Sequence, residues 1–222
     1  MGFTIGGIRE IRTGSRRRAR SSEVTAVAEY TGLWGWDVVP GARAVRSAGG
    51  RADCSCGAAG CPAPGAHPLD FAKELTAGAT LEEAAAAWAR TPGAAVLLPV
   101  GRRFDILDVP EAAGRGALAR LERMGLPLGP VAATPDHRAL FFVAPGAAAD
   151  LPGLLYRTGW DDADLDLRPL GDGDHITAPP SDHAGRGPMR WLRPPTLDSA
   201  GNPPQARLVV GTLAYLCARV CA

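Results

Sequence analysis

Lysine is nearly absent from this chain: Lys73 is the single lysine among 24 basic residues. The preference for arginine, together with abundant alanine, indicates a high-GC bacterial genome and by itself predicts no chemistry. Long apolar runs are also missing, and none reaches the roughly 18–20 residues that a membrane-spanning helix needs. The N-terminus has no hydrophobic core of the secretory kind. We therefore expect no membrane partner and a cytoplasmic, reducing location, where the five cysteines would not form a disulfide framework.

The composition is otherwise that of a globular protein with many turns. A chain of 222 residues can bury a sizeable core, as one domain with extensions. The 28 glycines and 20 prolines predict numerous loops between short elements.

The net charge of +1 is unevenly distributed. Residues 1–20 contain six arginines and one glutamate, which gives +5 and leaves −4 for the rest of the chain. We expect residues 1–20 to form a disordered basic arm, which either binds an anionic partner such as nucleic acid or is simply solvated. The arginines expected to contact DNA are Arg16, Arg17, Arg18 and Arg20.

Helices and short strands are mixed along the rest of the chain. The capping box Thr80 to Glu83 marks the start of one helix. Helices are predicted at 22–35, 80–90, 110–125 and 206–220, strands at 36–40, 94–98, 104–109, 131–134, 138–143, 164–168, 175–178 and 189–192, a loop at 41–53 and a Pro-rich linker at 194–204. The strands at 94–98 and 104–109 are expected to pair as a hairpin. This mixture favours the α+β class over a doubly wound sheet.

One predicted strand, Phe104 to Pro110, carries an acid into an apolar setting. A buried carboxylate is costly unless it is paired or binds a metal, so Asp108 is a candidate functional residue. Strand alternation places Phe104, Ile106, Asp108 and Pro110 on one face. A two-metal nucleotidyl-transfer strand would have a second acid at the position of Pro110.

A cysteine-rich loop gives the clearest chemical signal. Its spacing is Cys-x-Cys-x4-Cys-x5-His, formed by Cys54, Cys56, Cys61 and His67. Zinc prefers four thiolate or imidazole ligands in a tetrahedron, and a closed four-ligand site of this kind is structural. The alternative is a flexible loop with free thiols. Cys217 and Cys221 are expected to pack in the core rather than bind a metal.

Three further polar groups are candidates for binding. Asp164 and Asp166 share a face of their predicted strand. The turn His137-Arg138 precedes an apolar strand and could meet a phosphate. His183 follows a Pro-Pro turn. Each of these residues could equally belong to an ordinary polar loop.

Together, these residues resemble the N-terminal domain of bifunctional DNA primase–polymerases, a branch of the archaeo-eukaryotic primase superfamily. The resemblance runs from about Ser22 to Leu192. Its main segments are 35–40, 64–68, 107–109, 166–168, 171–173 and 178–181, followed by His183, Gly185 and Trp191. It implies a prim-pol/RRM-like mixed sheet with flanking helices in a domain at 21–193. That domain includes a zinc loop at 54–67 and is followed by a linker and C-terminal helix at 194–222.

The resemblance also implies a set of site residues. The first and last catalytic acids match Asp108 and Asp166, which would bind Mg or Mn. Pro110 replaces the second acid, and the family histidine falls at Ala139, two residues after His137. The residues implied to bind nucleotide are Arg138, Arg168, Ser181 and His183.

Three functions remain open at this stage. The first is a prim-pol-like protein that binds nucleotide or DNA through a degraded polymerase site, a pseudoenzyme with an accessory or regulatory role. It would take template handling from a protein partner or from its basic arm. The second is an active primase–polymerase that uses Glu111 or Asp105 and His137 as substitutes. The third is a zinc-stabilised protein-interaction module that binds no nucleic acid.

Overall fold

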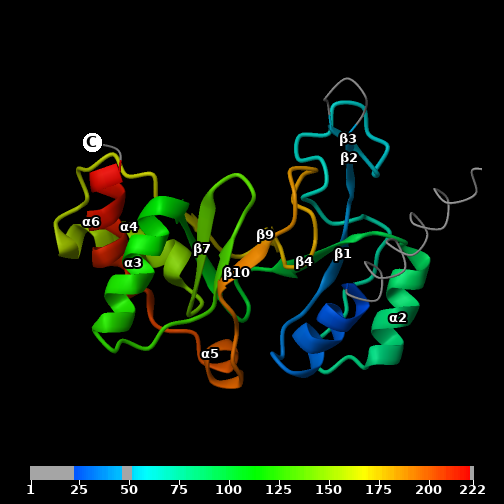
Figure 1. Cartoon of the computed structure of the whole chain (residues 1–222), viewed down its shortest axis with the longest axis horizontal. Coiled ribbons are helices and arrows are strands. Elements are labelled where there is room, and N and C mark those ends of the chain that lie inside the picture. The colour runs from blue at the N-terminus through cyan, green and yellow to red at the C-terminus, as the bar shows by residue number, and fades with distance from the viewer. Residues whose placement is uncertain (1–22, 47–51, 221–222) are drawn as a thin grey trace, which may run out of the picture.

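The computed structural model describes residues 23–46 and 52–220. The basic arm predicted at residues 1–20 lies outside this part. Among the described residues, we find no helix with the length and apolar character needed to span a bilayer. The chain forms a five-stranded and a three-stranded antiparallel sheet flanked by helices, with a two-stranded hairpin at one end (Figure 1).

The elements are short and follow one another in a mixed order. The five-stranded sheet has the order β10 (Arg190–Arg193), β6 (Val131–Ala133), β7 (Arg138–Val143), β5 (Asp105–Pro110) and β8 (Arg168–Leu170). The three-stranded sheet consists of β1 (Val39–Gly41), β4 (Ala95–Pro99) and β9 (His175–Thr177), and the hairpin of β2 (Ala44–Arg46) and β3 (Ala52–Cys54). Residues 23–32 are helical, and they are followed along the chain by α2 (Leu81–Arg90), α3 (Glu111–Arg123), α4 (Ala147–Thr158), α5 (Leu197–Gly201), the 3-10 turn η1 (Ala206–Leu208) and α6 (Val210–Val220).

The α+β class with flanking helices is confirmed. A mixed sheet was expected, but every pairing between described strands is antiparallel. The crossover through α3 does make β5 and β6 run in the same direction. However, β7 lies between them and is antiparallel to both, so they do not pair.

Both faces of the five-stranded sheet are covered. Leu107 and Val109 of β5 share an apolar core with α3, α4 and α6. Ile106 faces the other way and joins Trp36 and Phe142 in a second core, which reaches the three-stranded sheet. The rings of Trp36 and Phe142 stack with centroids 5.3 Å apart. Because side chains alternate along a strand, Asp108 lies on the face of Ile106, toward the space between the two sheets.

Local sequence signals explain several element boundaries. The predicted capping box is present at the start of α2, where the Thr80 hydroxyl accepts from the Glu83 N–H and the Glu83 carboxylate accepts from the Thr80 N–H. Pro110 directly precedes α3, and Gly125, with φ of 67°, follows its end. Both positions suit residues with these backbone preferences.

Two expectations about the first half of the chain were wrong. The loop predicted at 41–53 contains the hairpin of β2 and β3, two three-residue strands too short to give a periodic pattern. The strands near 94–98 and 104–109 do not pair as a hairpin. Instead, β4 pairs with β1 and β9, and β5 pairs with β7 and β8.

The prediction of a strand at 164–168 was also wrong, because β8 begins only at Arg168. The Glu111 N–H donates to the His137 carbonyl, just before β7, so residue 110 would direct its N–H to the opposite side, toward β8. Pro110 has no N–H to donate, and the ladder stops at the pair Asp108–Arg168. Asp166 therefore lies in an irregular segment beside the sheet. Helix α4 was missed because Pro152 lies inside it and hides its periodicity.

Candidate functional site

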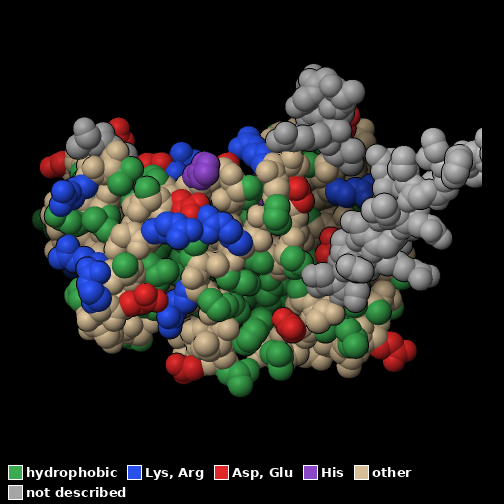
Figure 2. Space-filling model, viewed as in Figure 1, with side chains coloured by type: hydrophobic (Ala, Val, Ile, Leu, Met, Phe, Trp, Pro, Cys, Tyr) green, Lys and Arg blue, Asp and Glu red, His purple; other side chains and the backbone are tan. Residues whose placement is uncertain are grey.

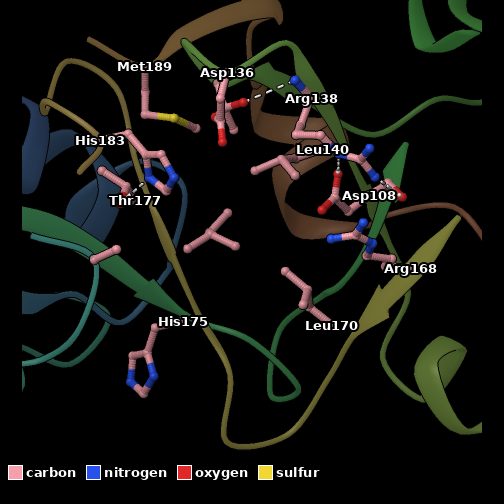
Figure 3. Close-up of a pocket in the computed structure, with 13 residues that line it drawn as sticks. Asp108, Asp136, Arg138, Leu140, Arg168, Leu170, His175, Thr177, His183 and Met189 are labelled. Carbon is pink, nitrogen blue, oxygen red and sulfur yellow. Dashed lines mark hydrogen bonds and ion pairs between the residues drawn. The ribbon is translucent and has the colours of Figure 1, made fainter. Parts of the chain in front are cut away.

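The register of β5 determines which side chains surround Asp108. Leu140 of β7 and Arg168 of β8 are its direct cross-strand partners, while Arg138 lies opposite Pro110. Cross-strand partners share one face of a sheet. The three strands therefore carry an acid and two arginines to the same side, as the close-up in Figure 3 shows.

Arg138 joins the two acids that the sequence singled out. Its Nε donates to Asp108 Oδ1 at 2.8 Å, its Nη2 donates to Asp166 Oδ1 at 3.0 Å, and its Nη1 also bonds Asp166. Arg168 makes a longer ion pair with Asp166, at 3.4 Å. The side chains of Arg138 and Asp108 are only 17% and 16% exposed. Asp108 and Asp166 thus converge from distant parts of the chain around one guanidinium group.

The surroundings shift the pKa values of the two acids in opposite directions. Burial raises the pKa of Asp108, and the hydrogen bond from Arg138 only partly offsets this effect. The same guanidinium lowers the pKa of Asp166, which is less buried. Two arginines next to two carboxylates make the cluster close to neutral overall.

A pocket of about 220 Å³ opens beside this cluster, between the five-stranded sheet and β9 (Figure 3). Its apolar lining comes mainly from Leu140, Leu170, Ile176 and Met189. Its polar lining consists of Asp108, Thr134, Asp136, Arg138, Arg168, His175, Thr177 and His183. Apolar walls with a few convergent polar groups are typical of small-molecule sites.

The far wall of the pocket has its own polar contacts. His183 Nδ1 lies 3.0 Å from the Thr177 hydroxyl, and burial lowers the pKa of His183, so its imidazole is neutral near pH 7. Asp136 pairs with Arg186 at 3.1 Å. Sequence reasoning named His183 but did not single out Asp136 or Thr177, because neither belongs to a recognisable motif. Asp136 reaches the pocket from the turn between β6 and β7, and Thr177 from β9.

Pro110 and Ala139 stand where the resemblance implies a catalytic acid and a histidine, and the structure shows where each of them points. Pro110 shares the face of Asp108, and the residue opposite it on β7 is Arg138. Ala139 is completely buried against the helical core, where Gly114 of α3 approaches it closely. A side chain at position 139 therefore points away from the Asp108 face.

The three proposed substitutes do not line the pocket. The Asp105 carboxylate accepts from the Ala148 N–H at the start of α4, on the helical side of the sheet. Glu111 is held by Arg115 at 2.7 Å and also bonds a second arginine, in β10. His137 is 89% exposed, and its Nδ1 lies 3.9 Å from Glu111 Oε2.

Of the other residues implied to bind nucleotide, some line the pocket and one supports a strand. Arg168 and His183 line the pocket. The hydroxyl of Ser181 is buried and accepts from the Val96 N–H at 2.8 Å, so it supports β4. Arg16, Arg17, Arg18 and Arg20 lie outside the described residues.

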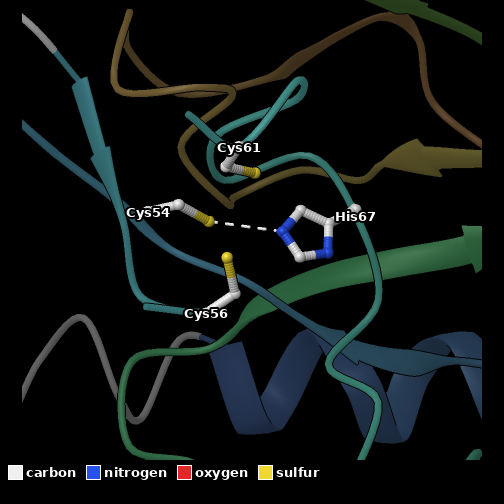
Figure 4. A group of neighbouring side chains, drawn as sticks. All are labelled: Cys54, Cys56, Cys61 and His67. Carbon is white, nitrogen blue, oxygen red and sulfur yellow. Dashed lines mark hydrogen bonds between the residues drawn. The ribbon is translucent and has the colours of Figure 1, made fainter. Parts of the chain in front are cut away.

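The four metal-ligand candidates form a compact cluster (Figure 4). One ligand atom from each of Cys54, Cys56, Cys61 and His67 lies within 4.8 Å of all the others. The separation between Cys54 Sγ and His67 Nε2 is 3.3 Å. A tetrahedral zinc ion with bonds of about 2.0–2.3 Å fits between ligands at such separations. The cluster could therefore bind a metal ion such as zinc.

Neighbouring backbone groups favour the metal-binding forms of His67 and Cys54. His67 Nδ1 lies 2.7 Å from the Pro68 carbonyl, so Nδ1 carries the proton and Nε2 presents its lone pair to the cysteines. Burial raises the pKa of the Cys54 thiol, but the N–H groups of Cys56 and Gly65 outweigh this and bring it to about 6. A thiolate is the form that ligates zinc.

Fold and site together define an α+β protein with a carboxylate- and arginine-lined pocket between two antiparallel sheets and a separate Cys3His cluster. The family model for the N-terminal domain of bifunctional DNA primase/polymerase matches residues 27–206, which is most of the chain. The chain therefore belongs to this Prim-Pol family, and the resemblance seen in the sequence is confirmed. No curated protein and no solved structure matches the chain significantly.

Proposed function

We propose that this Prim-Pol protein binds a nucleotide or nucleic acid through the pocket beside Asp108, that its polymerase site is degraded, and that its role is accessory or regulatory. The observation that carries the proposal is the placement of Arg138, which bonds both Asp108 and Asp166. Family membership supports a nucleotide or nucleic acid as the ligand class.

The charge of the cluster argues against two-metal catalysis. Two divalent cations about 3.5–4 Å apart need several carboxylates to balance their charge. Here Asp108 and Asp166 are already balanced by Arg138 and Arg168, and Pro110 supplies no further acid. The residues present do not fit a pair of Mg or Mn ions, and we derive no catalytic step through them.

The pocket suits one part of a nucleotide. Its volume of about 220 Å³ is below the roughly 300–1,000 Å³ of sites that enclose a whole small molecule. A base can pack on Leu140 and Ile176, while Arg168 and His183 offer donors to a sugar or phosphate. The side chain of Arg168 is 69% exposed, which leaves it free to reorient toward a ligand.

Calorimetric titration with dATP tests this proposal, once in Mg²⁺ and once in EDTA. Because Arg138 replaces the metal charge, we expect affinities that agree within about 3-fold in the two buffers. Arg168→Gln should weaken binding about 10-fold, the value of one charge-assisted hydrogen bond. The matched control is Arg90→Gln, an exposed arginine at the end of α2, which should change nothing. Undetectable dATP binding, or binding that EDTA abolishes, would contradict the proposal.

The two alternative functions make different demands on the site. An active enzyme would need Glu111, Asp105 or His137 near Asp108, and these side chains lie elsewhere. A pure interaction module would leave the pocket without a ligand, which the dATP titration also detects.

A further inference from the structure

A second hollow lies on the opposite side of the five-stranded sheet. It has a volume of about 420 Å³ and is formed by α3, the end of α4, η1 and α6. Helices α3, α4 and α6 cover the sheet face that carries Leu107 and Val109, whereas Asp108 points to the other face. The hollow is therefore a separate site from the carboxylate–arginine cluster.

Two aromatic side chains line this hollow from different parts of the chain. Tyr215 stands on α6 and is 36% exposed. Trp160 follows α4 and is half-buried. Its position is fixed by the helix end, where Gly159 has φ of 73° and the Trp160 N–H donates to the Leu155 carbonyl at 2.9 Å. Aromatic rings of this kind offer faces on which bases can stack.

Arginines surround the aromatic pair. The guanidinium groups of Arg120 and Arg219 lie 5.4 Å and 5.8 Å from the centre of the Tyr215 ring, and Arg219 Nη1 donates to the Tyr215 hydroxyl at 3.0 Å. Arg207 lines the hollow from η1. All three arginines are exposed. Figure 2 shows basic side chains gathered over α3 and α6 at this end of the molecule.

The positive charge here is not neutralised by neighbouring acids. Within residues 23–46 and 52–220, Arg120, Arg207 and Arg219 form no ion pair with a carboxylate, although acids follow Trp160 in the chain. The hydrogen bond and charge of Arg219, with a smaller effect of Arg120, lower the pKa of Tyr215. This hollow is thus an electropositive surface with one exposed and one half-buried aromatic ring.

We propose that this hollow binds single-stranded nucleic acid, with phosphates on Arg120 and Arg207 and a base stacked against Tyr215 or Trp160. Arginines beside aromatic rings are the chemistry that holds single strands without reading their sequence. The hydroxyls of Thr158 and Thr212 add hydrogen-bonding groups for the backbone. This site goes beyond the nucleotide pocket, since it would hold a strand on the other side of the sheet.

Fluorescence anisotropy of a labelled oligothymidylate of about 15 nucleotides, titrated with the full chain, tests this site. Arg207→Gln should weaken binding about 5-fold and reduce the slope of log K against log salt by about 0.7, the loss of one phosphate contact. Tyr215→Leu should weaken binding about 10-fold through lost stacking. Arg90→Gln removes an equally exposed arginine far from the hollow and should have no effect.

Several results would overturn the proposal. The first is an affinity for oligothymidylate that neither Arg207→Gln nor Tyr215→Leu changes. The second is a loss of affinity in Arg90→Gln as large as that in Arg207→Gln. Full displacement of the oligonucleotide by polyglutamate at equal charge would indicate an acidic protein partner instead. A parallel dATP titration keeps the two sites distinct, because failure of dATP binding refutes the pocket alone and leaves the oligonucleotide result intact.

Discussion

At the scale of single residues, Arg138 determines what the pocket can do. It faces Pro110 across the β5–β7 ladder and bonds Asp108 and Asp166, the two acids for which the sequence resemblance implied a catalytic role. An arginine holds its charge permanently, whereas a metal ion exchanges with solvent. The same two carboxylates therefore become part of a fixed ion-pair network in this chain.

Removing that guanidinium should destabilise the fold. In Arg138→Gln, Asp108 and Asp166 would lie close together without a full counter-charge. Because the site is partly buried, we expect the free energy of unfolding to fall by about 2 kcal/mol, measured by urea denaturation. Arg168→Gln is the control: its side chain is 69% exposed, so a change below about 0.5 kcal/mol is expected. Equal effects of the two substitutions would refute a special role for Arg138.

His183 should make stability depend on pH. Burial lowers its folded-state pKa below the unfolded value of about 6.5. Between these two values the unfolded chain binds more protons, so stability falls as pH decreases from 7 to 5.5. Its charged neighbours Asp136, Arg186, Asp182 and Asp108 remain unchanged in His183→Gln. Thermal melts should show a smaller pH-dependent loss in His183→Gln than in the wild type. A pH dependence identical to that of the wild type would exclude this histidine as the cause.

At the scale of elements, close packing of α3 on β7 positions the strands of the site. A Cβ on Gly114 would overlap the Cβ of Ala139, so the helix can approach the sheet only with glycine there. The sequence predicted this helix from its caps but gave no sign of the contact, because a small residue in a helix has many explanations. Similarly, alternation predicted a strand through Asp166, whereas β8 begins only at Arg168, because Pro110 has no N–H with which to extend the ladder toward Asp166.

Gly114→Ala should therefore be destabilising despite the better helix propensity of alanine. We expect a loss of about 2 kcal/mol in the free energy of unfolding from overpacking. Gly153→Ala in α4 is the matched control, since its Cβ would meet only the end of Arg157 at 3.7 Å. That substitution should stabilise the protein by up to about 1 kcal/mol. If Gly114→Ala were also stabilising, the result would contradict the tight contact between α3 and β7.

The cysteine loop should depend on a metal for its order. It returns to the three-stranded sheet through the Ala42 N–H to His67 carbonyl bond and the Leu69 N–H to Pro40 carbonyl bond. Purified protein should contain about one zinc per chain, and Cys56→Ser should lower that content sharply. Hydrogen exchange should then accelerate in the cysteine loop, while β5 and β7 stay protected because their cores are separate. Zinc content near zero after metal-replete expression would refute the site.

At the scale of the whole molecule, the sequence predicted the α+β class, the family and the pairing of Asp108 with Asp166 as neighbours. It could not predict that Arg138 would lie between them, because this depends on the β5–β7 register. Nor did it indicate the basic hollow, whose residues come from α3, α4, η1 and α6 and form no linear motif. Features carried by contiguous residues were accessible from the sequence, and features created by packing were not.

The two surfaces for which we propose nucleotide and nucleic-acid binding lie on opposite sides of one sheet. They are the pocket beside Asp108, which we propose as a nucleotide site, and the hollow at Tyr215, which we propose as a strand site. Under our proposal, a protein with both surfaces and a degraded polymerase site holds nucleic acid for another enzyme. We therefore expect that this protein does not polymerise nucleotides.

Primer extension on a primed single-stranded template, with Mg²⁺ or Mn²⁺ and all four dNTPs, tests that claim most directly. We expect the wild type to incorporate no more nucleotide than Asp108→Ala, because Arg138 already pairs with Asp108 and Asp166 and Pro110 supplies no further carboxylate. Robust, template-directed incorporation by the wild type that disappears in Asp108→Ala would contradict it.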